Sequence, residues 1–292
     1  MRRRYFFILP VVLILILLIG CAKQAVDIDG TQYQRPEFIE TRPDNIVVSN
    51  FLYQHDLVVP VELLKKPVKP DPPLEEDPNP NPAHKYAFII GISDYEGTQN
   101  DLQYCDDDAR DWKTYLQSQG FTIQMVLDRN ATSDAIVNGL TWLRDNAQPG
   151  DEIAFCYSGH GNSYRGYGSC LISTDLYYIT HEYIMQFIID ANTSKKMVAI
   201  DACKAGNFNG DAINGSIVAT ASDKSYSYDG EPWMSNGVWT YYYIETLENL
   251  GTVFNEDAIE YAETKMKEWA NSYTGVKATP KHKDLYTGKF DI

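Results

Sequence analysis

The chain has 292 residues, enough for one or two domains, and its 44% hydrophobic content is ordinary for a globular protein. Its formal net charge at pH 7 is −15, and its only Lys/Arg cluster lies within the first four residues. This balance argues against nucleic-acid binding and fits an acidic surface or a preference for basic substrates.

The N-terminus has the composition of a targeting segment, residues 1–21. Three arginines precede an apolar stretch at residues 5–19, which is shorter than the roughly 20 residues of a membrane-spanning helix. The stretch ends in Gly20 and Cys21, and the segment resembles a bacterial or archaeal lipoprotein signal whose cysteine is lipidated. The alternative is an uncleaved anchor. Either way, we expect the protein in the cell envelope, outside the cytoplasm and tethered to a membrane, with Cys21 as the lipid anchor.

Two segments separate this signal from the main domain. Residues 22–66 form an N-terminal region of unknown structure, with an apolar patch at residues 46–64 that could form one or two strands. Residues 67–83 hold seven of the 14 prolines of the chain, together with acidic residues. Such a segment is extended, stiff and solvated, so we expect it to be a linker to a domain at residues 84–292.

Strand and helix patterns alternate along this domain. Buried-strand patterns lie at residues 86–92, 122–127, 151–157, 197–200 and 216–221. Helical patterns lie at residues 106–119, 132–147, 180–191 and 240–250, and from residue 255 onward. Thr180 and Asn255 are placed to act as N-caps. The alternation predicts an α/β fold with a mostly parallel central sheet.

Two of the predicted strands lead into reactive side chains. The strand at residues 151–157 is followed by His160, and the strand at residues 197–200 is followed by Asp201 and Cys203. Because reactive groups gather at the carboxyl ends of strands in such sheets, parallel neighbours would bring the imidazole and the thiol to one edge. That pair is a base and a nucleophile.

Three motifs together carry a resemblance to a known family. They are YAFIIGISDY with LQYCDDDARDW, FCYSGHGN, and AIDACKAG. Their order, spacing and strand context resemble the caspase-like cysteine peptidases, specifically the metacaspase and prokaryotic caspase-like branch. The resemblance covers residues 85–291, including the stretch SNGVWTYYYIETL. It implies a three-layer sandwich with helices on both faces of the sheet, and cysteine endopeptidase activity on polypeptides.

By this resemblance, His160 and Cys203 form a catalytic dyad, and the backbone N–H groups of Gly161 and Cys203 form the oxyanion hole. A free thiol titrates near ~8.5, so it needs a neighbouring imidazole or positive dipole to supply thiolate. The thiolate attacks the peptide carbonyl, and the imidazole protonates the leaving amine. Taken singly, a satisfied loop histidine and a small buried cysteine would be the ordinary interpretations.

The resemblance also indicates the residue preferred before the cut bond. Caspases proper have Gln two positions before the nucleophile and prefer acidic residues, whereas this chain has Asp201. In metacaspases a pocket for Lys or Arg is lined by residues that correspond here to Cys105, Asp108, Ser158 and Asp201. Two carboxylates favour a basic side chain through charge-assisted hydrogen bonds. Carboxylates also suit the start of a helix, which alone could explain residues 106–108.

No metal site is expected. Cys156, His160 and Cys170 could be taken for zinc ligands, but Cys156 lies within a strand and the chain has no Cys-x-x-Cys pair. Many metacaspases bind calcium at an acidic cluster after the histidine, where this chain has only Asp175. We therefore expect no cofactor, although calcium activation stays open. The alternative function is a catalytically silent caspase-like domain that serves as a binding or scaffold module.

The tether contains few bonds that such an enzyme could cut. Four of its basic residues are followed directly by proline: Arg35, Arg42, Lys66 and Lys69. A bond to proline suits a strand-like peptidase cleft poorly, because proline lacks the N–H and has a fixed φ. We therefore expect any self-release after Lys65. A proline-rich composition explains Lys66 and Lys69 equally well.

Overall fold

The computed structural model describes residues 29–65, 76–249 and 254–292. The targeting segment with Cys21 and most of the proline-rich linker lie outside these ranges. Within them, no helix has the length and apolar character needed to cross a membrane.

A six-stranded sheet forms the middle layer. Its strands, in spatial order, are β10 (Lys281–Asp284), β9 (Ser216–Thr220), β8 (Lys196–Asp201), β4 (Glu152–Ser158), β2 (Lys85–Gly91) and β3 (Thr122–Leu127). All neighbours pair in parallel except β10, which is antiparallel to β9. The predicted, mostly parallel sheet is therefore confirmed.

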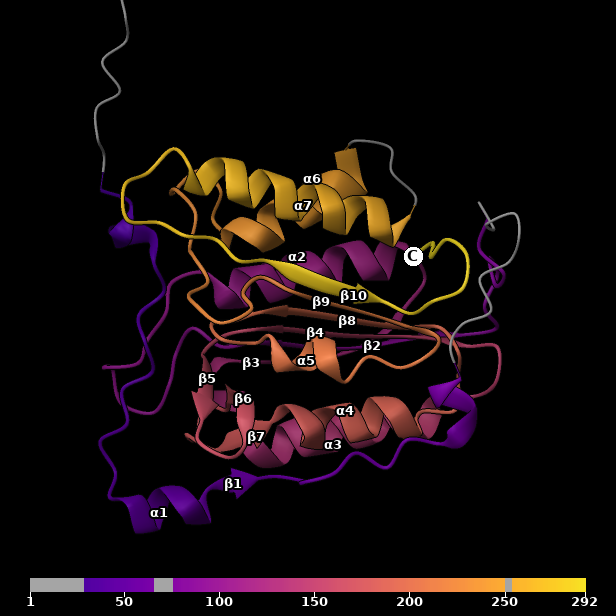
Figure 1. Ribbon diagram of the computed structural model, residues 1–292, viewed down its shortest axis with the longest axis horizontal. Coiled ribbons are helices and arrows are strands. Elements are labelled where there is room, and N and C mark those ends of the chain that lie inside the picture. The colour runs from indigo at the N-terminus through magenta and orange to yellow at the C-terminus, as the bar shows by residue number, and fades with distance from the viewer. Residues whose placement is uncertain (1–28, 66–75, 250–253) are drawn as a thin grey trace, which may run out of the picture.

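Helices cover both faces of this sheet (Figure 1). One layer contains α2 (Cys105–Ser118), α6 (Val238–Asn249) and α7 (Asn255–Ala270). The other contains α3 (Ser133–Asn146), α4 (His181–Asp190) and the short α5 (Asn207–Gly210). Strand side chains alternate between two apolar cores, one beneath each layer, as expected for a sheet buried on both faces. The predicted three-layer α/β sandwich is confirmed.

A second, smaller sheet combines three strands that follow His160, which have no counterpart among the predicted strands, with one short strand from the apolar patch at residues 46–64. It contains β1 (Phe51–Leu52), β7 (Tyr178–Thr180), β6 (Gly168–Ile172) and β5 (Gly161–Tyr164), in that spatial order. The pairs β5–β6 and β6–β7 are antiparallel, and β1 joins β7 in parallel. This sheet lies beside the ends of the parallel strands (Figure 1).

Residues 31–64, which we call the strap, lie against the domain. The strap contains the 3₁₀ turns η1 (Thr31–Tyr33) and η2 (Val61–Leu64), with α1 (Asp44–Ser49) and β1 between them. The patch at residues 46–64, expected to form one or two strands, thus contains part of a helix, one short strand and a turn. The strap runs down the side of the molecule where the parallel strands end and then along the layer of α3 and α4 (Figure 1, indigo).

The helix caps agree only in part with expectation. The hydroxyl of Thr180 accepts a hydrogen bond from the N–H of Tyr183 and caps α4, as predicted. The prediction that Asn255 caps the last helix is wrong, because Phe254 is the N-cap of α7 and Asn255 is its first residue. The amide oxygen of Asn255 instead accepts a hydrogen bond from the hydroxyl of Tyr243. A contact between helices therefore replaces the local cap.

Lys195 ties three segments together at the amino-terminal end of the sheet. Its ammonium has no solvent exposure and lies 2.8 Å from a carboxylate oxygen of Asp77, 2.5 Å from Asp291 and 3.2 Å from Glu152. These carboxylates come from the end of the linker, from the C-terminus and from the start of β4. Burying several charges is tolerated here because they are mutually paired.

We expect the substitution Lys195→Met to destabilise the protein by about 3–5 kcal/mol, because it leaves the buried carboxylate of Asp77 without its cation. The free energy of unfolding in urea measures this loss. Lys281→Met is the matched control, since the Lys281 side chain is 49% exposed and lies 3.4 Å from Asp223. It should cost less than about 1 kcal/mol. Equal effects of the two substitutions would contradict the structural role of Lys195.

Candidate active site

The register of the sheet brings His160 and Cys203 to the same edge. Strands β4 and β8 are parallel neighbours, and Ser158 pairs with Asp201. His160 and Cys203 each lie two positions beyond this pair. At Gly161 an added Cβ would lie only 2.1 Å from the carbonyl oxygen of Cys203, so the two chain segments touch and only glycine permits that approach.

The imidazole of His160 is held in a defined orientation. Its Nε2 lies 2.8 Å from the backbone carbonyl oxygen of Asn100, which can only accept, so Nε2 carries the proton and Nδ1 is left as the basic nitrogen. The backbone N–H of His160 donates to the hydroxyl of Tyr95, and its carbonyl accepts from the hydroxyl of Tyr157, both at 2.8 Å. These contacts fix the orientation of the ring, with Nδ1 as its basic nitrogen.

Cys203 lies in a sharp turn after β8. Its sulfur accepts a hydrogen bond from the backbone N–H of Ser227 at 3.3 Å. The next residue, Lys204, has a φ of 55°, in the left-handed region that non-glycine residues rarely adopt. The turn therefore takes the chain away from the sheet directly after the thiol.

Both reactive groups are buried and neutral. The exposed fraction is 1% for His160 and 3% for Cys203. Burial lowers the pKa of the His160 imidazole to about 4 and raises the pKa of the Cys203 thiol. The ring of Phe38, from the strap, meets the His160 ring edge-on with centroids 5.5 Å apart. In this arrangement the pair supplies little thiolate at neutral pH.

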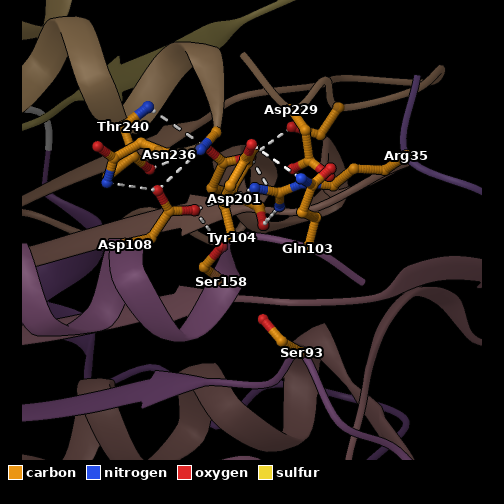
Figure 2. Close-up of polar contacts among 12 residues, drawn as sticks. Arg35, Ser93, Gln103, Tyr104, Asp108, Ser158, Asp201, Asp229, Asn236 and Thr240 are labelled. Atoms are coloured by element: carbon orange, nitrogen blue, oxygen red, sulfur yellow. Dashed lines mark hydrogen bonds and ion pairs between the residues drawn. The ribbon is translucent and has the colours of Figure 1, made fainter. Parts of the chain in front are cut away.

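Arg35 of the strap occupies the predicted substrate pocket (Figure 2). Its Nη2 lies 3.0 Å from Oδ2 of Asp108, and its Nη1 donates to the backbone carbonyl of Asp201 at 2.7 Å and lies 3.1 Å from its Oδ1. Its Nε lies 2.8 Å from Oδ1 of Asp229. The Arg35 side chain is 1% exposed, so the guanidinium is enclosed by three carboxylates.

Polar neighbours hold two of these carboxylates in place. Ser158 donates to Asp108 at 2.6 Å, and the hydroxyls of Thr240 and Ser227 donate to Asp201. The backbone N–H of Gly237 and the amide of Asn236 donate to the other oxygen of Asp108, at 2.9 and 3.1 Å. The pocket is therefore preorganised for a planar cation.

Cys105, the fourth predicted pocket residue, is fully buried at the start of α2. Burial raises the pKa of its thiol well above the usual value, and the charge of Arg35 lowers it. The structure thus places Cys105 within electrostatic reach of the guanidinium, and brings all four predicted pocket residues around one site.

The electrostatics of the pocket favour a bound cation. Burial raises the pKa of Asp108 and of Asp229; the charge of Asp201 raises both further, and that of Arg35 lowers both. Burial alone would lower the pKa of Arg35, but the carboxylates, Asp201 foremost, raise it well above its usual value. Without a bound cation, the three carboxylates of the pocket would have no positive charge to balance them.

Several residues of the site were not predicted from the sequence: Tyr95, Asn100, Tyr157, Ser227, Asp229, Asn236, Gly237 and Thr240. Five of them lie in the motifs that carried the family resemblance: Tyr95, Tyr157, Asn236, Gly237 and Thr240. At Gly237 an added Cβ would lie 2.4 Å from Nη2 of Arg35 and 2.5 Å from Oδ2 of Asp201. The sequence signal for this part of the site was Gly237, a glycine ahead of a predicted helix. Asp229 had none, because it is one aspartate among many in loops.

Comparisons with known proteins identify chains that resemble this one in sequence or in fold. A family model described as a caspase domain matches residues 84–284. Metacaspase-2 of Trypanosoma brucei brucei is 34% identical over 93 residues, 28% of this chain and 26% of that protein. Metacaspase-2 of Arabidopsis thaliana is 34% identical over 96 residues, 29% of this chain and 23% of that protein. The chain thus matches only about a quarter of the length of these curated relatives.

A solved structure is similar in fold. The crystal structure of protein GSU0716 from Geobacter sulfurreducens superimposes with a TM-score of 0.53 and covers 70% of this chain and 94% of that chain. The sequence identity is 14%, so the similarity concerns the fold alone.

We expect acidification to destabilise the protein through His160. The pKa of this imidazole is about 4 in the folded chain, against roughly 6.5 when unfolded. The unfolded state therefore binds the proton first, and the stability held above the unfolded pKa is lost as the pH falls toward 4.

The measurement is urea unfolding at about pH 7 and about pH 4.5. The wild type should lose about 2 kcal/mol more than His160→Asn, which has no imidazole to protonate. Equal losses in the two proteins would show that His160 titrates normally in the folded state.

Proposed function

The chain belongs to the caspase domain family, and from this premise we propose that it is a cysteine endopeptidase that cuts polypeptides after Arg or Lys. It would use His160 and Cys203 as its catalytic dyad. Cys21 would hold it by a lipid to a membrane of the cell envelope, outside the cytoplasm. The support for the anchor is the sequence of residues 1–21.

The arrangement of the dyad suits thiol chemistry once a substrate occupies the site. Nδ1 of His160 takes the proton of the Cys203 thiol, and the thiolate attacks the peptide carbonyl. The backbone N–H groups of Gly161 and Cys203 would stabilise the oxyanion. The imidazolium then protonates the leaving amine, and water hydrolyses the thioester. Thiolate and imidazole supply every step, so we propose no metal cofactor.

The observation that carries the specificity is the guanidinium of Arg35 between Asp108 and Asp201. The chain itself supplies a ligand for this pocket, and that ligand is an arginine. Asp229 adds an ion pair to Nε, an atom that lysine does not have. A lysine side chain would gain the charge attraction without this third directed contact, so we propose that arginine is preferred to lysine.

A catalytically silent domain is the second candidate. The observation that favours it is the burial of the dyad, which leaves both groups neutral beneath the strap. The presence of a base, a thiol and a preorganised pocket at one site favours an active peptidase over a silent domain. A scaffold would not need these groups to lie together.

The first test is a panel of fluorogenic peptides that differ only in the residue before the cut bond. We expect hydrolysis after Arg and Lys, and Cys203→Ala should abolish it while the unfolding transition is retained. Cys170→Ala, which removes another buried free thiol, is the matched control and should stay active. Undiminished turnover by Cys203→Ala, or a preference for Asp, would refute the proposal.

A second test concerns Asp229. We expect Asp229→Asn to lower the ratio of kcat/KM for Arg over Lys peptides by about tenfold or more, because losing one partner of a buried charge pair costs on the order of 2–5 kcal/mol. The ratio is the proper readout, because any change in the fraction of enzyme with an accessible site affects both substrates equally. An unchanged ratio would show that Asp229 does not discriminate between the two side chains.

A further inference from the structure

We infer that the strap is an intramolecular pseudosubstrate: Arg35 fills the specificity pocket, the residues after it cover the dyad, and Pro36 prevents their cleavage. The structure would then be the closed state of the enzyme, which opens when the strap leaves. The inference rests on the proposed function, since it takes the pocket of Asp108 and Asp201 to be the substrate site.

The strap binds through its backbone as an added strand. It lies antiparallel to residues 227–229. The N–H of Arg35 donates to the carbonyl of Ser227 at 3.0 Å, and the N–H of Asp229 donates to the carbonyl of Tyr33 at 2.8 Å. Main-chain pairing of this kind, with a side chain in a pocket, is how extended peptides are commonly recognised.

One residue places this added strand beside the thiol. The carbonyl of Ser227 binds the N–H of Arg35, and the N–H of Ser227 binds the sulfur of Cys203 at 3.3 Å. The backbone of Arg35 and the sulfur of Cys203 thus bind the same residue, Ser227, while the side chain of Arg35 fills the pocket. Arg35 therefore has the position of the residue before a cut bond, and the bond in question is Arg35–Pro36.

The residues after Pro36 close the site. Phe38 packs on the imidazole of His160, with ring centroids 5.5 Å apart. The N–H of Ile39 donates to the side chain of Asn100 at 2.8 Å, and its carbonyl accepts from that side chain at 3.2 Å. Asn100 is also the residue whose backbone carbonyl orients His160. A substrate chain cannot reach the dyad without displacing these contacts.

Proline explains why the strap is bound and not cut. Cleavage would join the sulfur of Cys203 to the carbonyl carbon of Arg35 and release the nitrogen of Pro36 as an amine protonated by His160. The proline ring fixes φ, removes the N–H and restricts the residue before it. These constraints oppose the geometry of attack, while binding of the arginine side chain is unaffected.

The tether makes this inhibitor effective. A segment of the same chain acts at an effective concentration that reaches the millimolar range for short flexible connections. A free peptide must compete with that concentration. Any cut between the strap and the domain would turn the strap into a dissociable peptide, and self-release after Lys65 would have this consequence.

The first experiment compares Arg35→Ala with Arg42→Ala in the full chain. Arg42 is the matched control, because it is also followed by proline but pairs with Glu40 and the carbonyl of Leu176, outside the pocket. Two readouts are used: kcat/KM for a short fluorogenic Arg peptide, and the rate of iodoacetamide alkylation of Cys203, with buried Cys156 as internal reference.

We expect Arg35→Ala to raise both readouts about tenfold or more, and Arg42→Ala to change them less than about twofold. Equal values for wild type and Arg35→Ala in both readouts would overturn the inference, even if the wild type were an active peptidase. Faster alkylation in Arg35→Ala without peptide hydrolysis by any variant would support coverage of the thiol by the strap and refute the proposed function instead.

Pro36→Ala gives a test that keeps Arg35 and its three carboxylate partners. With an ordinary peptide bond in place, the strap should become a substrate of its own site. N-terminal sequencing should find a new end beginning Ala-Glu-Phe in Pro36→Ala and an intact chain in the double variant with Cys203→Ala. If the bond after Arg35 stays uncut in an active Pro36→Ala enzyme, the assignment of Arg35 to the position before the cut is overturned.

Discussion

The ion pairs of Arg35 hold the strap against the edge of the sheet where β4 and β8 end. Asp108 lies in the first turn of α2, Asp201 ends β8, and Asp229 belongs to the loop before α6. Three carboxylates in a buried site repel one another, and each would pay a large desolvation penalty without a cation. The guanidinium meets all three, because its nitrogens point in different directions within one plane. Carboxylates from α2, from β8 and from the loop before α6 therefore all bind this one guanidinium.

The binding of Arg35 in the pocket also affects the protonation state of His160 and Cys203. The guanidinium is anchored in the pocket while the next residues of the strap exclude water from His160 and Cys203. Without water the imidazole is a weak base and the thiol a weak acid, so the two groups stay neutral. Occupation of the pocket and silencing of the thiol are thus consequences of one bound segment, and both would be reversed by its departure.

Local patterns determined most of the fold. Buried strands, amphipathic helices and the cap at Thr180 are set by neighbouring residues, so the sequence determined the α/β class and placed His160 and Cys203 after two strands. Predictions from neighbouring residues were wrong where a side chain binds a residue far away in the sequence. Asn255 satisfies the hydroxyl of Tyr243 instead of the end of its own helix. The three short strands that follow His160 in the second sheet were missed because they depend on pairing with one another.

The sequence by itself determined which residue types stand at this edge of the sheet: by their family resemblance, the motifs indicated His160, Cys203, Asp108, Ser158 and Asp201 as members of one site. It also showed that Arg35 precedes a proline. Only the tertiary structure decided that Arg35 lies in that site, paired with residues 73, 166 and 194 positions away along the chain. Contacts over such separations leave no periodic signal, because they arise from charge and shape complementarity between segments that folding brings together.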